Sequence, residues 1–193
     1  MLEQLIQQDQ ELFLYLNGLG TTTWDGFWMT YTTKIYWAPL YAVLLYLMFK
    51  KYNSKAFVLS IVTIALMVAF TDQITNLFKN HIALRPRPCF QDGIVEHMRL
   101  VKSYCGARYG YFSGHASNSM AVAVFSGLIL AYKYKKLIYV LIPWALLMGY
   151  SRIYVGVHYP LDVISGGIFG AFSGFIFYKL NNYLHKRFSL NLK

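Results

Sequence analysis

The sequence predicts an all-α integral membrane protein with about five transmembrane helices, preceded by an N-terminal amphipathic segment in the membrane interface. Three observations lead to this fold class. The 193 residues are 56% hydrophobic and only 13% charged, whereas about a quarter of the residues in a soluble domain are charged. Five long apolar stretches are separated by short polar connections. Basic residues gather in alternate connections, as is typical of multi-pass membrane proteins.

The first 30 residues are amphipathic rather than continuously apolar. Leucine and isoleucine at positions 2, 5, 6, 12 and 16 recur near helical spacing among acidic and amide side chains, which predicts a helix lying in the interface. A second amphipathic piece is expected at residues 24–30, with Thr22 or Thr23 as its N-cap. The start MLEQLIQQDQE has no basic region and no small-residue cleavage site, so a signal peptide is not expected.

Five stretches have approximately the 20 apolar residues that a spanning helix requires. They cover residues 31–49, 56–78, 116–132, 137–157 and 159–178. The short connections predict that neighbouring helices are antiparallel. We therefore expect one membrane domain, residues 1–193, with an interfacial segment at 1–30, a transmembrane core at 31–178 and a basic cytoplasmic tail at 179–193.

Three segments contain basic residues without acidic neighbours. Their members are Lys50, Lys51, Lys55, Lys133, Lys135, Lys136, Lys179, Lys186, Arg187 and Lys193. The other Lys and Arg are balanced by the 8 Asp and Glu, so these segments account for the formal net charge of +10. The positive-inside rule places them in the cytoplasm. The loop 79–115 and the turn at His158 then face the exterior, or the periplasm in a bacterial-type inner membrane, and the basic character does not indicate nucleic-acid binding.

The apolar stretch SRIYVGVHYPLDV carries three ionisable residues, Arg152, His158 and Asp162. Pro160 suits the first turn of a helix, and Asp162 follows His158 by four residues. The carboxylate is therefore able to accept a hydrogen bond from one imidazole nitrogen and leave the other as a nucleophile. The alternative is a His–Asp pair that only caps the fifth helix.

Two further polar clusters are expected at the same membrane level. In YFSGHASNS, the SGH tripeptide at 113–115 begins the third helix, and a helix N-terminus favours an anion. In FKNHIALRPRPCF, Lys79, Arg85 and Arg87 follow the second helix, and guanidinium forks suit phosphate oxygens. Together the clusters predict a phosphate site with an acid and a nucleophile. The alternatives are headgroup anchors for the Arg-Pro pairs and a plain N-cap for SGH.

These residues resemble the signatures of the type 2 phosphatidic acid phosphatase (PAP2) family, K-x6-R-P, P-S-G-H and S-R-x5-H-x3-D. The third signature is matched at each fixed position, by Ser151, Arg152, His158 and Asp162. The second is matched at 113–115, but Phe112 replaces its proline.

The first signature departs from the family spacing. Five residues separate Lys79 from Arg85 and seven separate it from Arg87, where the family has six. We choose Arg87 as the phosphate ligand because it lies nearest the loop leading to His115. The resemblance covers approximately residues 78–167.

The resemblance implies metal-independent hydrolysis of a lipid phosphate or diphosphate through a phosphohistidine, without a cofactor. His158, oriented by Asp162, is expected to attack phosphorus, and His115 to protonate the leaving oxygen. The phosphate ligands carried over from the family are Lys79, Arg87, Ser113, Gly114 and Arg152, with Arg85 as a further candidate. Besides Asp162, only Asp92 and Glu96 lie near the site in sequence, too few for a carboxylate cage around a metal.

A site at the rim of lipid-facing helices favours a substrate whose tail stays in the bilayer. Undecaprenyl diphosphate, phosphatidylglycerol phosphate, phosphatidate and a lipid A phosphate all qualify. The vanadate-dependent haloperoxidases share similar signatures but are soluble. The alternative function is non-catalytic binding or transport of a lipid phosphate, for which Asp72 would suit a polar path across the membrane; otherwise Asp72 is a buried acid paired with a neighbouring helix.

Cys89 and Cys105 are the only cysteines, and both fall in the loop expected outside. A disulfide closing about 17 residues would stabilise the fold by about 3 kcal/mol in the chain-entropy model. Two free thiols or a buried apolar pair are the alternatives.

Overall fold

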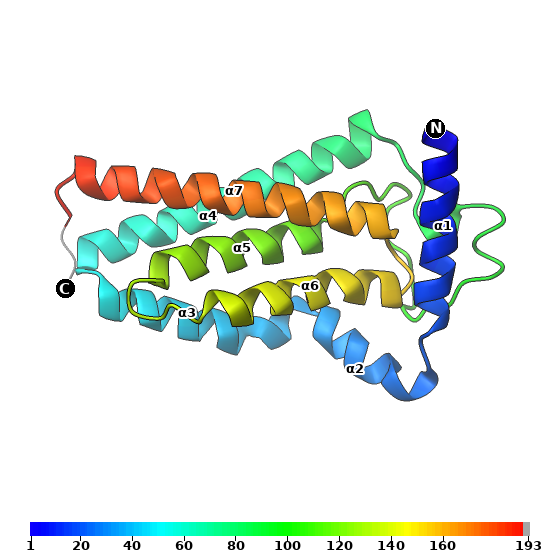
Figure 1. The fold of residues 1–193 in the computed structure, drawn as a ribbon, viewed down its shortest axis with the longest axis horizontal. Helices are drawn as coiled ribbons and strands as arrows, with labels where there is room; N and C mark the ends of the chain where they lie inside the picture. The colour runs from blue at the N-terminus through cyan, green and yellow to red at the C-terminus, as the bar shows by residue number, and fades with distance from the viewer. Residues whose placement is uncertain (191–193) are drawn as a thin grey trace.

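The structure is a computed structural model that describes residues 1–190, and this part of the chain forms helices and no β-strand. The longer helices are α1 (Leu2–Gly18), α2 (Thr22–Thr32), α3 (Ala38–Lys51), α4 (Ser54–Leu77), α5 (Gly114–Leu130), α6 (Ile138–Tyr154) and α7 (Pro160–Arg187). Three short elements are η1 (Lys34–Trp37), the π-helical turn η2 (Phe78–Ile82) and η3 (Pro88–Phe90). Helices α3 to α7 run side by side as a bundle, and α1 lies across one end of it (Figure 1).

Two helical segments are long and apolar enough to cross a membrane, Ser54–Ile82 and Pro160–Arg187. The shorter apolar helices Gly114–Leu130 and Ile138–Tyr154 pack beside them in the bundle. Many bundle side chains that face outward are large and apolar, among them Val58, Leu66, Leu146, Ile168 and Phe172. This distribution is that of an all-α protein with lipid as its solvent.

Several helix boundaries differ from those expected. The stretch 31–49 is not one helix, because α2 ends at Thr32, η1 intervenes, and α3 begins at Ala38 with Pro39 in its first turn. Helix α2 has Thr21 as its N-cap rather than Thr22 or Thr23. Helix α7 continues to Arg187, so most of the expected tail is helical. The last tail residues, including Lys193, lie outside the described residues.

Helix α6 ends three residues before the expected boundary, and the reason is local. Gly156 has φ +83, a conformation that glycine adopts without steric cost. Its N–H donates to Ile153 O, and the N–H of Val157 donates to Arg152 O at 3.1 Å. These two bonds form the Schellman motif that ends a helix. The chain then turns sharply, and His158 follows directly.

Helices α5 and α7 form the tightest packed pair of the bundle. Gly166, Gly170 and Gly174 of α7 are spaced four residues apart, and a methyl group at any of them would collide with a backbone carbonyl of α5 or of its N-cap, Ser113. Small residues at this spacing let two membrane helices approach closely. Where this contact between α5 and α7 begins, Ser113 N donates to Asp162 O at 2.9 Å. The N-termini of both helices therefore meet at one point.

Helix α1 turns a polar side toward the bundle. Asp9, Phe13 and Asn17 are buried at spacings of four residues, which places them on one helix face. The side-chain amide of Asn17 contacts four backbone groups. Its Nδ2 donates to Arg99 O, Ile153 O and Tyr154 O, and its Oδ1 accepts from Arg99 N. Most of the apolar residues that predicted interfacial binding are exposed, namely Leu2, Leu5, Ile6 and Leu12. The helix is thus packed onto protein while these four apolar side chains remain exposed and able to face lipid.

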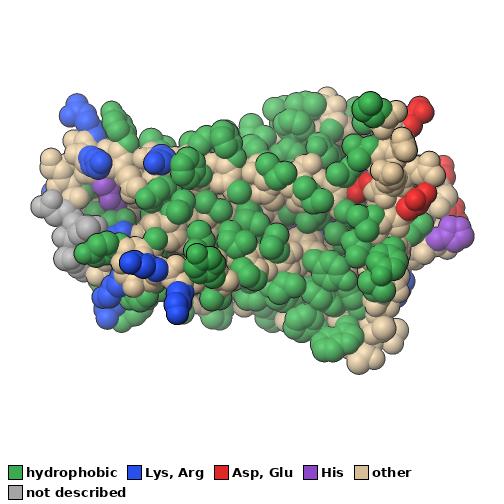
Figure 2. All heavy atoms as spheres, viewed as in Figure 1, with side chains coloured by type: hydrophobic (Ala, Val, Ile, Leu, Met, Phe, Trp, Pro, Cys, Tyr) green, Lys and Arg blue, Asp and Glu red, His purple; other side chains and the backbone are tan. Residues whose placement is uncertain are grey.

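Charge is distributed unequally between the two ends of the bundle. Lys and Arg side chains gather at the end opposite α1, whereas the visible Asp and Glu side chains lie at the α1 end (Figure 2). The connections α3–α4 and α5–α6 and the C-terminus of α7 all lie at the basic end (Figure 1). The three basic segments identified from the sequence therefore share one side of the molecule.

Candidate active site

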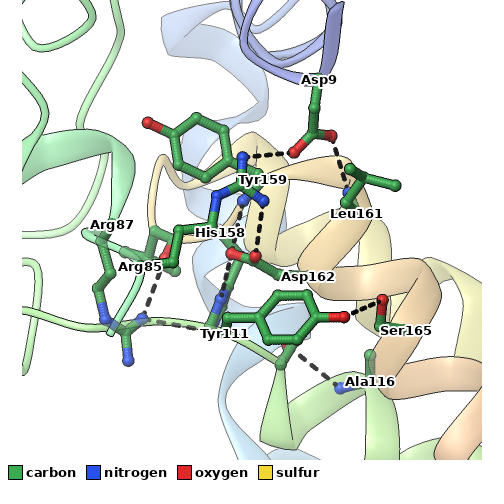
Figure 3. Close-up of polar contacts among 12 residues, drawn as sticks. Asp9, Arg85, Arg87, Tyr111, Ala116, His158, Tyr159, Leu161, Asp162 and Ser165 are labelled. Carbon is green, nitrogen blue, oxygen red and sulfur yellow. Dashed lines mark hydrogen bonds and ion pairs between the residues drawn. The ribbon is translucent and has the colours of Figure 1, made fainter. Parts of the chain in front are cut away.

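The turn after α6 holds His158 against Asp162 at the α1 end of the bundle. His158 Nδ1 lies 3.2 Å from Asp162 Oδ2, and the two residues are 2% and 1% exposed. The same carboxylate oxygen accepts a hydrogen bond from Tyr159 N at 3.0 Å. Asp162 therefore both contacts the imidazole and caps α7 (Figure 3). The contact expected for an oriented histidine and the capping contact of the alternative are both present.

Arg87 reaches the other side of the imidazole ring. Its Nη1 lies 3.2 Å from His158 Nε2 and donates to Val157 O at 3.0 Å, and its Nε donates to Ala107 O at 2.8 Å. An arginine side chain has only donors, so His158 Nε2 must be the acceptor and Nδ1 must carry the proton that points to Asp162. Burial, reinforced by the positive charge of Arg87, lowers the pKa of His158 well below its usual value. The ring is therefore neutral, with its lone pair on Nε2.

A short backbone pairing delivers both arginines to the same side. Arg87 N donates to Arg108 O at 2.9 Å, and Gly110 N donates to Arg85 O at 3.0 Å. In an extended segment, residues two apart point to the same face. Arg85 and Arg87 consequently both face the His158–Asp162 pair, while Pro86 points away.

Arg85 is bound by two carboxylates. Its Nη1 lies 3.1 Å from Asp162 Oδ1 and its Nη2 lies 2.6 Å from Asp9 Oδ2. Its guanidinium also lies 4.1 Å from the centre of the Tyr159 ring. Of the two arginines, Arg87 therefore borders the free nitrogen of His158, and Arg85 supports Asp162. Asp9 was not among the predicted site residues.

The N-terminus of α5 forms a second wall of the site. Ser113 is its N-cap, and Ser113 Oγ accepts from Ala116 N at 3.5 Å, the geometry of the plain capping interpretation. Gly114 lies beside Lys79, whose Nζ is 3.5 Å from the place where a Cβ on Gly114 would be. The structure thus brings Lys79 to the SGH tripeptide.

Lys79 lies in a π-helical turn. Ala83 N donates to Phe78 O at 2.9 Å, a bond that spans five residues and therefore encloses one residue more than an α-helical turn. The interval from Lys79 to Arg87 is also one residue longer than the family spacing. The π turn provides a place for this additional residue.

Arg152 is buried in the last turn of α6 and is only partly satisfied. Its Nη1 donates to Thr32 Oγ1 at 2.5 Å. Its Nε is buried and has no hydrogen-bond partner among the described residues. A buried unpaired guanidinium N–H is costly, so this group is suited to an anion.

His115 borders an apolar cavity of about 310 Å³ between α3, α4, α5 and α6. Most of its lining is aliphatic, including Leu44, Met48, Ile64, Met67, Val122 and Met148. Polar side chains on the wall include Lys34 and Asn118. A hydrophobic compartment thus begins beside His115 and extends into the bundle.

Gly110 is a further residue that sequence reasoning missed. A Cβ at this position would lie 2.9 Å from Arg87 Cγ, 3.4 Å from His158 Nδ1 and 3.6 Å from Asp162 Oδ2. A side chain at this position would therefore displace Arg87 and stand in contact with the His158–Asp162 pair. A glycine between two aromatic residues gave no signal of this role in the sequence.

Two other predicted features also have a place in the structure. Cys89 and Cys105 form a disulfide with Cα atoms 6.3 Å apart, inside the range that a bridge requires. Asp72 accepts a hydrogen bond from Asn118 Nδ2 on α5 at 2.6 Å, as expected for an acid paired with a neighbouring helix. Within residues 1–190, no three His, Cys, Asp or Glu side chains are grouped so that they could hold a metal ion.

Comparisons with known proteins agree with the resemblance. A lipid A 4'-phosphatase of Bacteroides thetaiotaomicron is 35% identical over 97% of this chain and 83% of its own length. A lipid A 4'-phosphatase of Porphyromonas gingivalis is 30% identical over 96% of this chain and 78% of its own length.

A solved structure has the same fold. The transmembrane PAP2 type phosphatidylglycerolphosphate phosphatase of Bacillus subtilis is 21% identical and has a TM-score of 0.73, over 93% of this chain and 87% of that one. The predicted fold class, an all-α integral membrane protein, is confirmed. The sequence model of the PAP2 superfamily matches residues 56–186, a range that contains the predicted site residues. On this evidence, the chain belongs to the PAP2 superfamily.

Proposed function

We propose that this membrane phosphatase hydrolyses the phosphate monoester of a lipid A-type glycolipid through a phosphohistidine on His158. The observation that carries the proposal is the pair of contacts made by the two ring nitrogens of His158. Asp162 binds Nδ1, and the lone pair of Nε2 faces Arg87 in a buried, cationic pocket. A neutral histidine in this setting is a nucleophile placed beside a ligand for the phosphoryl group.

The reaction proceeds in two steps. His158 Nε2 attacks phosphorus, the bond from phosphorus to the lipid oxygen breaks, and His115 gives its proton to that oxygen. Water then attacks the phosphohistidine, His115 takes a proton from it, and phosphate leaves with His158 restored. The phosphoryl oxygens are held, and the transition-state charge is spread, by Lys79, Arg87, Ser113, the Gly114 N–H and Arg152.

The apolar cavity supports a lipid as the leaving group. An in-line displacement places the leaving oxygen opposite the nucleophile, on the side of the acid His115. The cavity begins beside His115 and is largely aliphatic. A lipid tail would therefore lie in the cavity or along its opening while the phosphate occupies the cationic pocket. The relatives from Bacteroides thetaiotaomicron and Porphyromonas gingivalis, named lipid A 4'-phosphatases, favour lipid A over the other three candidate lipids.

The distribution of charge supports a site on the outer face. The basic connections lie at the end of the bundle opposite the turn between α6 and α7, which contains His158 (Figures 1 and 2). By the positive-inside rule this end is cytoplasmic. The protein is then a multi-pass protein of a bacterial inner membrane, and its site opens to the periplasm.

One assay tests the proposal. Purified protein in detergent is given lipid A, undecaprenyl diphosphate, phosphatidylglycerol phosphate and phosphatidate, and phosphate release is measured with and without EDTA. We expect the highest kcat/KM for lipid A and no loss in EDTA. His158→Ala should lose about 1,000-fold or more, because about 4 kcal/mol of barrier lowering depends on the nucleophile.

The other outcomes are equally informative. Preference for another of the four lipids would overturn the lipid A assignment but not the chemistry. A His158→Ala variant that keeps a tenth of the wild-type rate, or a rate that depends on magnesium, would contradict the mechanism. Absence of phosphate release from any of the four lipids would favour the binding or transport alternative.

A further inference from the structure

We propose that Asp9 of α1 is a positioning residue of the active site, which acts through Arg85 to fix Asp162 and thereby the ring of His158. The proposal rests on the proposed function, in which His158 is the nucleophile. It assigns the N-terminal helix a part in the chemistry, although the helix lies outside the residues matched by the superfamily.

A continuous chain of contacts carries the inference. Asp9 Oδ2 pairs with Arg85 Nη2 at 2.6 Å, Arg85 Nη1 pairs with Asp162 Oδ1 at 3.1 Å, and Asp162 Oδ2 contacts His158 Nδ1 at 3.2 Å. Each carboxylate thus uses a different nitrogen of the same guanidinium (Figure 3). The planar fork of arginine holds two partners in a fixed relative geometry.

The second oxygen of Asp9 holds the same turn by an independent contact. Asp9 Oδ1 accepts a hydrogen bond from Leu161 N at 2.8 Å. This N–H belongs to the first turn of α7, where amide groups have no partner inside the helix. Leu161 precedes Asp162 directly, so Asp9 grips both the backbone beside Asp162 and the arginine that binds its side chain.

Asp9 itself is fixed in place. It is 4% exposed, and burial raises the pKa of its carboxyl while the bond to Arg85 opposes that shift. Phe13, one turn further along, packs on the Tyr159 ring with centroids 5.3 Å apart, and Asn17 is bonded to the end of α6. A buried carboxylate needs matched partners to offset its desolvation cost, and a helix that only rests on the membrane surface does not require such an arrangement.

The role is tested by kinetics on the full-length protein. Asp9→Asn should lower kcat about 10- to 100-fold, because a displacement of about 1 Å at the nucleophile costs up to about a hundredfold. KM should change less than about threefold, since Asp9 does not face the phosphate pocket. Asp9→Glu, which keeps the charge, should recover most of the loss. Glu11→Gln removes a charge from the exposed side of the same helix and should have wild-type kinetics.

A double-mutant cycle separates positioning from simple anchoring of α1. If Asp9 acts through Arg85, adding Asp9→Asn to Arg85→Gln should lower kcat by less than about threefold more. The proposal would be overturned if Asp9→Asn lowered kcat by the same factor in the wild-type and Arg85→Gln proteins, or if it changed KM and left kcat unchanged. Thermal unfolding of each variant identifies those that do not fold.

If Asp9→Asn does not fold, Arg85→Lys replaces it in the test. An ammonium group lacks the fork, so kcat should still fall about tenfold, and a wild-type kcat would overturn the proposal. Wild-type protein and His158→Ala are measured in the same assay. If these two behave as the proposed function requires while Asp9→Asn has no effect, only the positioning role is rejected.

Discussion

Arg87 lies against the one nitrogen of His158 that Asp162 leaves free, with Nη1 3.2 Å from Nε2. The contact fixes the tautomer, because a guanidinium only donates. It also places a cation where an oxygen of the phosphate must arrive if Nε2 is to attack phosphorus. In the proposed mechanism, the nucleophile and its phosphate ligand are therefore already in contact.

The first prediction concerns the shape of this cation. Arg87→Lys should lower kcat/KM by about 100-fold although the charge is kept, because an ammonium group cannot replace bonds to Val157, Ala107 and a phosphate at once. Arg108→Lys, at an exposed position of the same loop, should leave kcat/KM unchanged. Comparable losses in both variants would show that the loop, and not the guanidinium, matters.

The second prediction concerns pH. Since the pKa of His158 is lowered by burial and by Arg87, the nucleophile stays neutral below its usual pKa, and the acidic limb of the kcat/KM profile should lie below about pH 6.5. The unfolded chain binds a proton here that the folded protein does not, so the free energy of unfolding should also fall as pH drops below about 6.5. Arg87→Gln should move the acidic limb to higher pH, and an unchanged limb would contradict this account.

The third prediction concerns Gly110. A methyl group there would press on Arg87 and approach His158, so Gly110→Ala should reduce kcat at least about tenfold. Gly167 of α7 has open space around it and provides the matched control. Equal kcat values for Gly110→Ala and Gly167→Ala would show that the loop adapts without cost.

The fourth prediction concerns the cavity beside His115. Val122→Trp should fill part of it and raise KM for a long-chain lipid phosphate, while hydrolysis of a short, water-soluble phosphate monoester stays close to wild type. Val140→Trp, at a position that is 65% exposed on α6, controls for the added bulk. Equal effects on both substrates would mean that the tail does not use this cavity.

The fifth prediction concerns the disulfide. Replacing both Cys89 and Cys105 with Ser should lower the unfolding temperature by about 6–12 °C, as expected for the loss of about 3 kcal/mol in a chain of this size. Under reducing conditions, the wild-type protein and the double Ser variant should unfold at the same temperature. An unchanged unfolding temperature would indicate that packing alone holds this loop.

Much of the fold follows from the sequence because its causes are local. Apolar length predicts helices in lipid, and Ser113, Pro160 and the polar connections mark where helices begin. The PAP2 resemblance, read from motif residues, is confirmed by the superfamily match. The contact between His158 and Asp162 was predictable because four residues in one turn bring the two side chains together.

Other features were decided by contacts between distant segments. Which arginine faces the imidazole depends on the pairing of residues 85–87 with residues 108–110, and Gly110 has a role only because that pairing brings it to His158. Asp9 lies 76 positions from Arg85, and an acid in an amphipathic helix normally indicates the solvent side. Sequence periodicity shows that the helix has two faces. Only the tertiary structure determines that the face with Asp9 packs against Arg85 and α7, because the partners of a buried carboxylate are brought to it by the fold of distant segments.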